Sequence, residues 1–501
     1  MSKLSGIKAY FKGLSKRQKV IWIVAVVLLL LLIAGGIAAA VLLTRKDESL
    51  PGVLKRKDYY YAIRATDEDG FRLSDDFIVG LQLDDFVKTT LSEAEGVTLS
   101  EELLLTSYGA TPGEKAEYSF TYKGLEIASI TVEVVSNDAI AVSDAVSLGN
   151  IANGTGTYIL TSDIDLTPVT AQISNFSGRL FGNHFTLTGS LPAGGLFKRI
   201  SDAEVRGLEF SVNSEMNYSA ANFPSDGLNI GVLASRTDDS DISECYVKGS
   251  IAVNYSAPTN NSVIRIGGLV GFAKAGARSN LNTPVYSLMR CGSEAALTVR
   301  GNGVVYIGGI YGRAENIGAE NLRCYGEISF EGSASALKEL YAGGIGGYHG
   351  KEYGAALQTG HELESTNRIY FYGTLRLNVP GDSGNAYAIK AGGIFGAAER
   401  LSMTNSEFRG VMEITSAAPL HSGGITGEAS CDLNAVMRIN GVRSVGKMTL
   451  NATGICYGGG VVGVMTGNAE YLNVAESILP ELTGESDKTR VVDRGAALKE
   501  Q

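Results

Sequence analysis

The chain has 501 residues, of which 43 are Lys or Arg and 53 are Asp or Glu, so its formal net charge is −10. An acidic chain without a basic stripe is not expected to bind nucleic acid, and its length allows several domains. The 63 Gly and 10 Pro residues follow no triplet period, which favours a fold with many tight turns over a collagen-like one.

The amino-terminal region combines a basic tail with a long apolar segment. Residues 1–19 carry several Lys and Arg and no acidic side chain, and residues 20–43 are an uncharged apolar run. A helix of this length spans a hydrocarbon core of about 30 Å. We expect a cytoplasmic tail, a retained transmembrane helix and an extracellular carboxyl-terminal part. The alanines at 38–40 also fit a signal-peptidase site, so cleavage stays open as the alternative.

A charged linker, 44–57, leads to a segment, 58–137, in which apolar and polar residues alternate. Such alternation is typical of half-buried strands, and a two-residue turn between two strands indicates a hairpin. We predict a small immunoglobulin-like β-sandwich that acts as a stalk. The expected strands lie at 59–64, 76–81, 116–122, 125–128 and 130–135, with Lys123 and Gly124 as the hairpin turn.

The largest part of the chain, 138–482, is organised by a repeated Gly-Gly-[Leu/Ile/Val]-x-Gly unit, preceded by two degenerate copies. The spacing between second glycines is 31 to 49 residues, which is typical of a solenoid whose turns bury their apolar faces against one another. We predict an all-β fold with one coil of a parallel β-helix per repeat, followed by a disordered tail at 483–501. The glycines assigned to tight turns are Gly195, Gly231, Gly268, Gly309, Gly344, Gly393, Gly424 and Gly460.

The repeats also resemble a known family. The resemblance rests on the opening Gly-x-Tyr-x-Leu-x-x-Asp-Ile-Asp-Leu at 156–166, the Phe-x-Gly-x-x-x-Gly-Asn step at 176–183 and the later Gly-Gly units. These features are similar to GLUG-motif bacterial surface proteins and to the β-helical part of M26-type immunoglobulin A peptidases. The resemblance covers about 150–475 and implies a right-handed parallel β-helix on a bacterial cell surface. It does not extend to the zinc peptidase domain, because His361-Glu362 is not followed by the second His of a His-Glu-x-x-His motif.

The sequence predicts no catalytic residue, no metal site and no cofactor. Asp163 and Asp165 share one strand face, as a carboxylate pair of a glycan-active β-helix enzyme would, but their place in the opening motif favours a turn role. The cysteines show no Cys-x-x-Cys spacing and are expected as small core residues rather than disulfide partners. They are Cys245, Cys291, Cys324, Cys431 and Cys456.

Tyrosines in the middle turns are the stronger functional signal. A tyrosine offers a flat apolar ring and a hydroxyl group, which suits binding to sugars or proteins, and the alternative is that most of them are core or ladder residues of the coil. The candidate binding residues are Tyr306, Tyr311, Tyr325, Tyr348, Tyr370 and Tyr372.

Together these patterns predict a membrane-anchored bacterial surface protein with a non-catalytic β-helix that binds a surface glycan or a protein. A polysaccharide-active enzyme and a scaffold subunit of an envelope or extracellular assembly stay open as alternatives. The two longest gaps between repeat glycines predict inserted loops, which are frequent binding sites. Any partner is therefore expected at 270–307 and 346–391.

Overall fold

The computed structural model describes residues 58–64, 97–99, 112–122, 125–276, 286–350, 365–381, 389–400, 402–431, 436–466, 468–483, 490–492 and 498–499. The predicted basic tail, transmembrane helix and linker at 1–57 lie outside these ranges. So do the expected strand at 76–81, the turn at Lys123 and Gly124, and most of the tail after 483.

A four-stranded sheet, here called sheet A, precedes the repeats and has the order β1-β4-β3-β2. β1 (Tyr59–Arg64) runs parallel to β4 (Leu125–Val135), whereas β3 (Lys115–Tyr122) is antiparallel to β4 and to β2 (Val97–Leu99). The pairing of β3 with β4 confirms the predicted hairpin. Among the described residues this segment contains a single sheet, so the sandwich, which requires two, stays a prediction.

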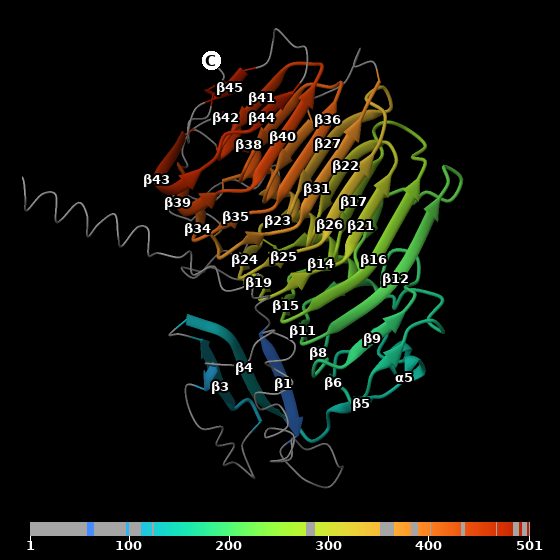
Figure 1. Cartoon of the computed structure of the whole chain (residues 1–501). Helices are drawn as coiled ribbons and strands as arrows, with labels where there is room; N and C mark the ends of the chain where they lie inside the picture. Colours follow the sequence, from blue (N-terminus) through green and yellow to red (C-terminus); the bar gives the residue numbers. More distant parts are fainter. Residues whose placement is uncertain are drawn as a thin grey trace, which may run out of the picture. The chain divides into compact units, whose positions relative to one another are not determined.

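The repeats form an all-β solenoid of parallel strands, which confirms the predicted architecture. Three sheets of 25, 9 and 8 strands, here called B, C and D, run through it, and each strand pairs with the equivalent strand of the next turn. Figure 1 shows these strands side by side, following the chain from green through yellow to red. A complete turn passes from sheet B to sheet D, then to sheet C, and back to sheet B.

Sheets D and C contribute one strand each per turn. Sheet D contains β13 (Leu228–Ile230), β17 (Val263–Gly267), β22 (Gly303–Gly308), β27 (Leu337–Gly343), β32 (Ile389–Gly392), β37 (Leu420–Gly423), β41 (Cys456–Gly459) and β45 (Arg490–Val492). Sheet C contains β10 (Phe197–Ser201), β14 (Ala234–Asp238), β18 (Val270–Lys274), β23 (Tyr311–Glu315), β28 (Gly346–Gly350), β33 (Phe395–Glu399), β38 (Thr426–Ser430), β42 (Val462–Thr466) and β46 (Leu498–Lys499).

Sheet B contributes two or three strands per turn. Its first turns contain β5 (Ile140–Val142), β6 (Thr157–Leu160), β7 (Ile164–Asp165), β8 (Arg179–Phe181), β9 (Thr186–Gly189), β11 (Glu204–Arg206), β12 (Glu209–Tyr218), β15 (Asp241–Ser243) and β16 (Tyr246–Tyr255). Its middle turns contain β19 (Tyr286–Met289), β20 (Gly292–Ser293), β21 (Ala296–Arg300), β24 (Gly318–Glu320), β25 (Arg323–Cys324), β26 (Glu327–Glu331), β29 (Ser365–Asn367), β30 (Tyr370–Phe371) and β31 (Thr374–Val379). Its last turns contain β34 (Ser402–Thr404), β35 (Glu407–Phe408), β36 (Val411–Ser416), β39 (Val436–Ser444), β40 (Lys447–Ala452), β43 (Asn468–Ser477) and β44 (Glu481–Thr483).

One continuous apolar core fills the coil, because alternate residues of each strand point inward. In β36, Met412 and Ile414 are buried while Glu413 between them is exposed. Equivalent positions stack from turn to turn, as Phe371 and Phe408 do with ring centroids 6.1 Å apart. Full burial of such a side chain contributes roughly 1.5–3 kcal/mol. The short helix α5 (Ala145–Gly149) adds Leu148 to this core at the first turn.

The repeat glycines lie where each strand of sheet D passes into the next strand of sheet C. A Cβ atom on Gly268 would lie 2.1 Å from the carbonyl oxygen of Gly309, and one on Gly309 would lie 2.5 Å from that of Gly344. Of the eight glycines assigned to turns, Gly195 also has a positive φ, +113°. Close approach of successive turns therefore disfavours a side chain at most of these positions, and a positive φ angle adds to this effect only at Gly195.

The assignment of Gly231 needs a correction. The register pairs Ile230 with Ile266 and Ala234 with Val270, so Gly231 is equivalent to Gly267, the first glycine of a pair. Val232 occupies the second position. The sequence could not distinguish the two positions, because this degenerate copy contains a single glycine.

From β14 onward, short and long connections from sheet C back to sheet B alternate along the solenoid. The connections after β18, β28 and β38 are 275–285, 351–364 and 431–435, that is 11, 14 and 5 residues. Those after β10, β14, β23 and β33 have two residues each, and that after β42 has one. The two longest connections fall in the two longest gaps between repeat glycines, where loops were predicted. Most of their residues lie outside the described ranges.

Candidate functional site

Outward side chains of sheets D and C meet along one line, here called the Arg–Tyr strip. The register of sheet D places Arg265, Tyr306, Tyr341 and Lys390 in one column over four successive turns. The facing column of sheet C comes from residues seven positions later in each turn. The strip consists of Arg265, Phe272, Tyr306, Arg313, Tyr341, Tyr348, Lys390, His421 and Glu428.

The glycine junction between the two strands brings these columns together. Because no side chain separates the strands there, the outer faces of β22 and β23 approach each other closely. Arg313 donates a hydrogen bond from Nη1 to the Tyr306 hydroxyl at 3.1 Å, and its guanidinium carbon lies 5.1 Å from the Tyr306 ring centroid. The same guanidinium lies 4.9 Å from the Tyr348 ring centroid. Arg313 thus links two successive turns through cation–π contacts.

The strip tyrosines form a ladder rather than a flat platform. Tyr306 and Tyr341 stack with centroids 4.5 Å apart and planes 13° apart, and only 6% and 8% of their surfaces are exposed. Tyr348 meets both rings edge-on. Since the neighbouring ring and Arg313 cover the ring faces, a ligand cannot stack on Tyr306 in this arrangement. Burial raises the pKa of Tyr306 despite the opposing charge of Arg313, so its hydroxyl stays protonated at neutral pH.

Two of the strip cations form ion pairs with nearby carboxylates. Arg313 forms an ion pair with Glu315 at 2.6 Å, and Lys390 forms one with Glu428 at 2.9 Å. His421 lies 2.9 Å from Glu428 through Nδ1. Burial alone would raise the pKa of Glu428, but the hydrogen bond from His421 and the charge of Lys390 outweigh it and lower the pKa.

Arg265 differs from the other strip cations. Its guanidinium carbon lies 4.6 Å from the Phe272 ring centroid, and Nη1 donates to the neutral amide oxygen of Asn229 at 2.9 Å. Within the described residues it forms no ion pair. The buried Nε atoms of Arg265 and Arg313 have no hydrogen-bond partner among these residues. Burial and the like charge of Arg313 lower the pKa of Arg265 to about 10.

The remaining tyrosine candidates occupy two other places. Tyr325, Tyr370 and Tyr372 are half-buried on the outer face of sheet B, where the Tyr372 ring stacks with both others, at 5.3 and 6.0 Å. Tyr311 is fully buried, and its hydroxyl hydrogen bonds with Nδ1 of His349 at 2.8 Å. Its place is therefore the core, so a direct binding role does not fit Tyr311.

A second polar cluster joins sheet A to the solenoid. The backbone N–H groups of three alternate residues on one edge of β1 donate to side chains of sheet B and its turns. Asp58 donates to the Tyr246 hydroxyl at 2.7 Å, Tyr60 to His184 Nε2 at 2.8 Å, and Ala62 to Asn183 Oδ1 at 2.8 Å. The edge of β1 is thus satisfied by side chains rather than by another strand. Accepting from Tyr60 requires His184 to be unprotonated at Nε2.

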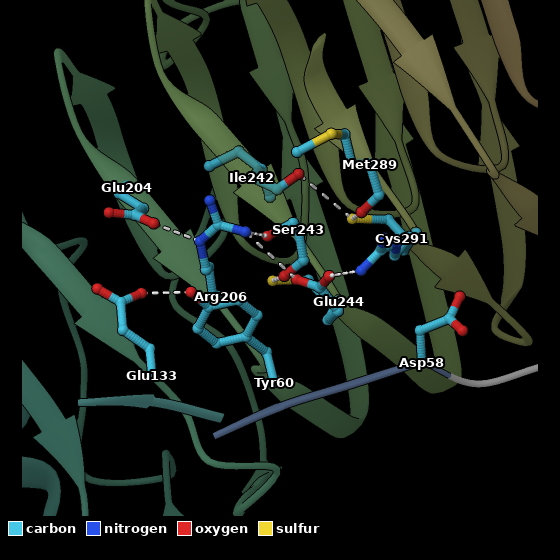
Figure 2. Close-up of polar contacts among 12 residues, drawn as sticks. Asp58, Tyr60, Glu133, Glu204, Arg206, Ile242, Ser243, Glu244, Met289 and Cys291 are labelled. Atoms are coloured by element: carbon cyan, nitrogen blue, oxygen red, sulfur yellow. Dashed lines mark hydrogen bonds and ion pairs between the residues drawn. The ribbon is translucent and has the colours of Figure 1, made fainter. Parts of the chain in front are cut away.

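Charged groups surround this contact, as Figure 2 shows. Glu133, only 2% exposed, accepts hydrogen bonds from the Tyr60 hydroxyl and from Arg179, the latter at 2.6 Å. Arg206 lies over the Tyr60 ring at 4.6 Å, between Glu204 and the buried Glu244.

The two carboxylates of this cluster respond differently to their surroundings. Burial would raise the pKa of Glu133, but the hydrogen bonds from Tyr60 and Arg179 outweigh it and lower the pKa. Burial dominates at Glu244 and raises its pKa. One of the Glu244 carboxylate oxygens has no hydrogen-bond partner among the described residues. Buried charges of this kind stabilise little in net terms, but removing one partner leaves an uncompensated charge, so loss of a single contact in the cluster is unfavourable.

The other sequence candidates have structural roles. Asp165 accepts a hydrogen bond from the Thr167 N–H at 2.9 Å, which fits the turn role favoured by the sequence. Asp163 instead accepts one from the Thr186 N–H at 2.7 Å, 23 positions further along the chain. All five cysteines are buried, as predicted for core residues. In the part of the chain that the structure describes, no group of three or more His, Cys, Asp or Glu side chains could hold a metal ion.

Of the candidate binding residues given above, Tyr306 and Tyr348 lie in the strip, and the charged residues of the strip were not identified from the sequence. The signal that locates them is positional. Strip residues stand three positions before and four positions after the second glycine of each pair, as Arg265 and Phe272 do around Gly268.

Comparison of the chain with protein-family models, with curated proteins and with solved structures finds no match. Within the described ranges, no helix has the length and apolar character needed to cross a membrane, and the predicted anchor at 20–43 lies outside those ranges.

Proposed function

We propose that this chain is a membrane-anchored bacterial surface protein whose solenoid binds a surface glycan or a protein without catalysis. The proposal includes a single transmembrane helix at 20–43, with the tail before it in the cytoplasm and the rest outside the cell. It also includes an immunoglobulin-like stalk at 58–137 and a right-handed β-helix of the GLUG-motif type at 138–482. The uncharged apolar run after a basic tail and the repeated Gly-Gly units support these parts.

The observation that carries the binding proposal is the Arg–Tyr strip. It places hydroxyl groups, cations and carboxylates in register over successive turns of a rigid scaffold, about 4.8 Å apart. A periodic line of polar groups suits an extended, repetitive ligand. Its dimensions are set by backbone hydrogen bonds between turns, so the groups are arranged before any ligand arrives.

The test uses the full-length protein in detergent micelles on arrays of glycans and surface proteins. A strip variant, Tyr348→Ala with Lys390→Ala, should lose binding that the wild-type protein shows. The control variant, Thr374→Ala with Lys447→Ala, changes outward side chains of sheet B and should keep it. Thermal unfolding of both variants checks that the fold is intact.

Two results would count against the proposal. Equal binding by the strip variant and the wild-type protein would show that the strip is not the binding surface. Release of shortened chains from a polysaccharide incubated with the protein would favour the enzyme alternative.

A further inference from the structure

We infer that Arg265 and Arg313 bind an oxyanion carried by an acidic polysaccharide. This inference rests on the proposed function, because it assigns a ligand class to the Arg–Tyr strip. It starts from an imbalance of charge within the strip. Arg236 is paired with Asp238 at 2.6 Å and Arg313 with Glu315 at 2.6 Å, whereas Arg265 forms no ion pair within the described residues.

Arg265 places a further positive charge beside the Arg313–Glu315 ion pair, whose single carboxylate cannot balance both guanidinium groups. Arg265 and Arg313 belong to adjacent turns and to facing columns of the strip. Each has a buried Nε–H without a hydrogen-bond partner among the described residues. The excess positive charge of the half-buried Arg265 is unfavourable in the free protein, and an oxyanion placed against Arg265 and Arg313 would balance it. Guanidinium groups match the geometry of such ligands through paired N–H donors.

The rest of the strip indicates what carries the anion. Beyond Arg313, the Tyr341 hydroxyl donates to Glu339 at 2.8 Å and the Tyr348 hydroxyl donates to Glu399 at 2.6 Å. The hydroxyl oxygens keep lone pairs that accept hydrogen bonds, and the carboxylates accept them as well. This part of the strip suits a ligand rich in hydroxyl groups and low in charge.

These two parts together favour an acidic polysaccharide over other polyanions. A nucleic acid carries a phosphate on every nucleotide, so its charges would meet the strip carboxylates beyond Arg313. An acidic polysaccharide has isolated charges separated by neutral, hydroxyl-bearing stretches. The carboxylate of a uronic acid and a sulfate ester present the same oxyanion chemistry to the two arginines, and the experiment separates them.

The experiment measures binding of the full-length protein in detergent micelles to three polymers of similar length. Polygalacturonate supplies carboxylates, dextran sulfate supplies sulfate esters, and dextran is neutral. We expect binding to at least one charged polymer and none to dextran. Arg265→Gln should weaken binding about tenfold or more, the usual effect of losing a charged hydrogen bond. Arg265→Lys should restore part of the affinity.

Arg300→Gln is the matched control. Arg300 is an exposed arginine of sheet B that pairs with Glu331 at 2.6 Å, so its loss should leave binding unchanged. If Arg265→Gln does not fold, the wild-type protein decides the question, since its binding should weaken with added NaCl and compete with free galacturonate.

Several outcomes would overturn the inference. They are equal binding to dextran, unchanged binding by folded Arg265→Gln, insensitivity to both salt and galacturonate, and failure of every charged polymer to bind. If binding nevertheless depends on Tyr348 and Lys390, the strip remains the binding surface and only the ligand class is wrong. If neither set of variants matters, the proposed function fails as well.

Discussion

Replacing Gly309 with alanine tests why the solenoid needs its paired glycines. The new methyl group would lie 2.5 Å from the carbonyl oxygen of Gly344 and 2.3 Å from Sγ of Cys324. Carbon atoms in contact prefer separations of about 3.5 Å or more, so the next turn would have to move by about 1 Å. Gly344 belongs to the backbone of that turn, so it cannot move without disturbing the sheet.

The cost can be worked from the bonds that hold the two turns together. The N–H groups of Ile310 and Tyr311 both donate to the carbonyl oxygen of Ile345, at 2.9 and 3.1 Å. A displacement of about 1 Å would break both bonds, each worth about 1 kcal/mol. Strain from overpacking adds about 1–3 kcal/mol, and the stiffer unfolded chain returns about 0.4–1 kcal/mol. The net loss should be about 3 kcal/mol.

Gly149→Ala is the matched control. Gly149 ends α5, and a Cβ atom there would meet nothing within 4 Å, so this variant should be as stable as the wild type or slightly more stable. Urea denaturation of the full-length proteins gives the stability difference, and hydrogen exchange at Ile310 and Tyr311 locates it. In a solenoid the damage should be confined to the affected interface between turns. A Gly309→Ala protein as stable as Gly149→Ala would refute the close-contact explanation.

Four further predictions follow from other parts of the molecule. Tyr246→Phe removes the hydroxyl that accepts from the buried Asp58 N–H, so the free energy of unfolding should fall by about 1–3 kcal/mol and hydrogen exchange at Asp58 should accelerate. Unchanged exchange would contradict the contact between β1 and sheet B. Burial alone would raise the pKa of Glu133, but hydrogen bonds outweigh it and hold the pKa below its ordinary value of 4.5. The stabilising effect of Glu133 is therefore complete above pH 4.5 and declines as the pH falls below that value. Glu133→Gln should therefore flatten the acid limb of the stability–pH curve, and an unaltered curve would count against this. Burial raises the pKa of the Cys324 thiol to about 12, so a thiol reagent at pH 8 should label it after denaturation and not before. Arg376→Gln should lower the free energy of unfolding in urea by less than about 1 kcal/mol, because Arg376 and the two carboxylates that it contacts are all exposed. A larger loss would show that the three charges stabilise the fold as a network.

The solenoid could be predicted because its determinants repeat and lie close together in the sequence. The glycines at 267–271 and 308–312 impose the same close approach on every turn, and alternation such as that of Met412 and Ile414 specifies the buried face. Variable connections do not disturb this pattern, because the additional residues leave the strand register intact. The degenerate repeat at Gly231 is the place where this local signal was too weak to fix the alignment.

The candidate site was harder to predict, because it depends on which residues stack across turns. Tyr311 and Arg313 are two positions apart, and strict alternation would place them on the same face. Instead, Tyr311 is buried in the core, whereas Arg313 contacts Tyr306 on the outer face. Contacts with sheet A lack even this partial signal. Asn183 and Ala62 are 121 positions apart, and a side chain that bonds to a strand edge leaves no periodic pattern in the sequence.

The alternating connections between sheets C and B limit how this fold can change. An inserted loop leaves the coil and returns to it, so two chain segments lie side by side. Each segment is about as wide as one strand, and the loop therefore occupies about 10 Å along the solenoid. Adjacent turns are only about 4.8 Å apart, so an inserted segment occupies the space of two turns. The connections at 275–285 and 351–364 leave the corner at 316–317 between them with two residues. Extensions added to the already long connections should therefore be tolerated, whereas a new insertion at 316–317 would place long connections in three successive turns and require more width than the turn spacing provides.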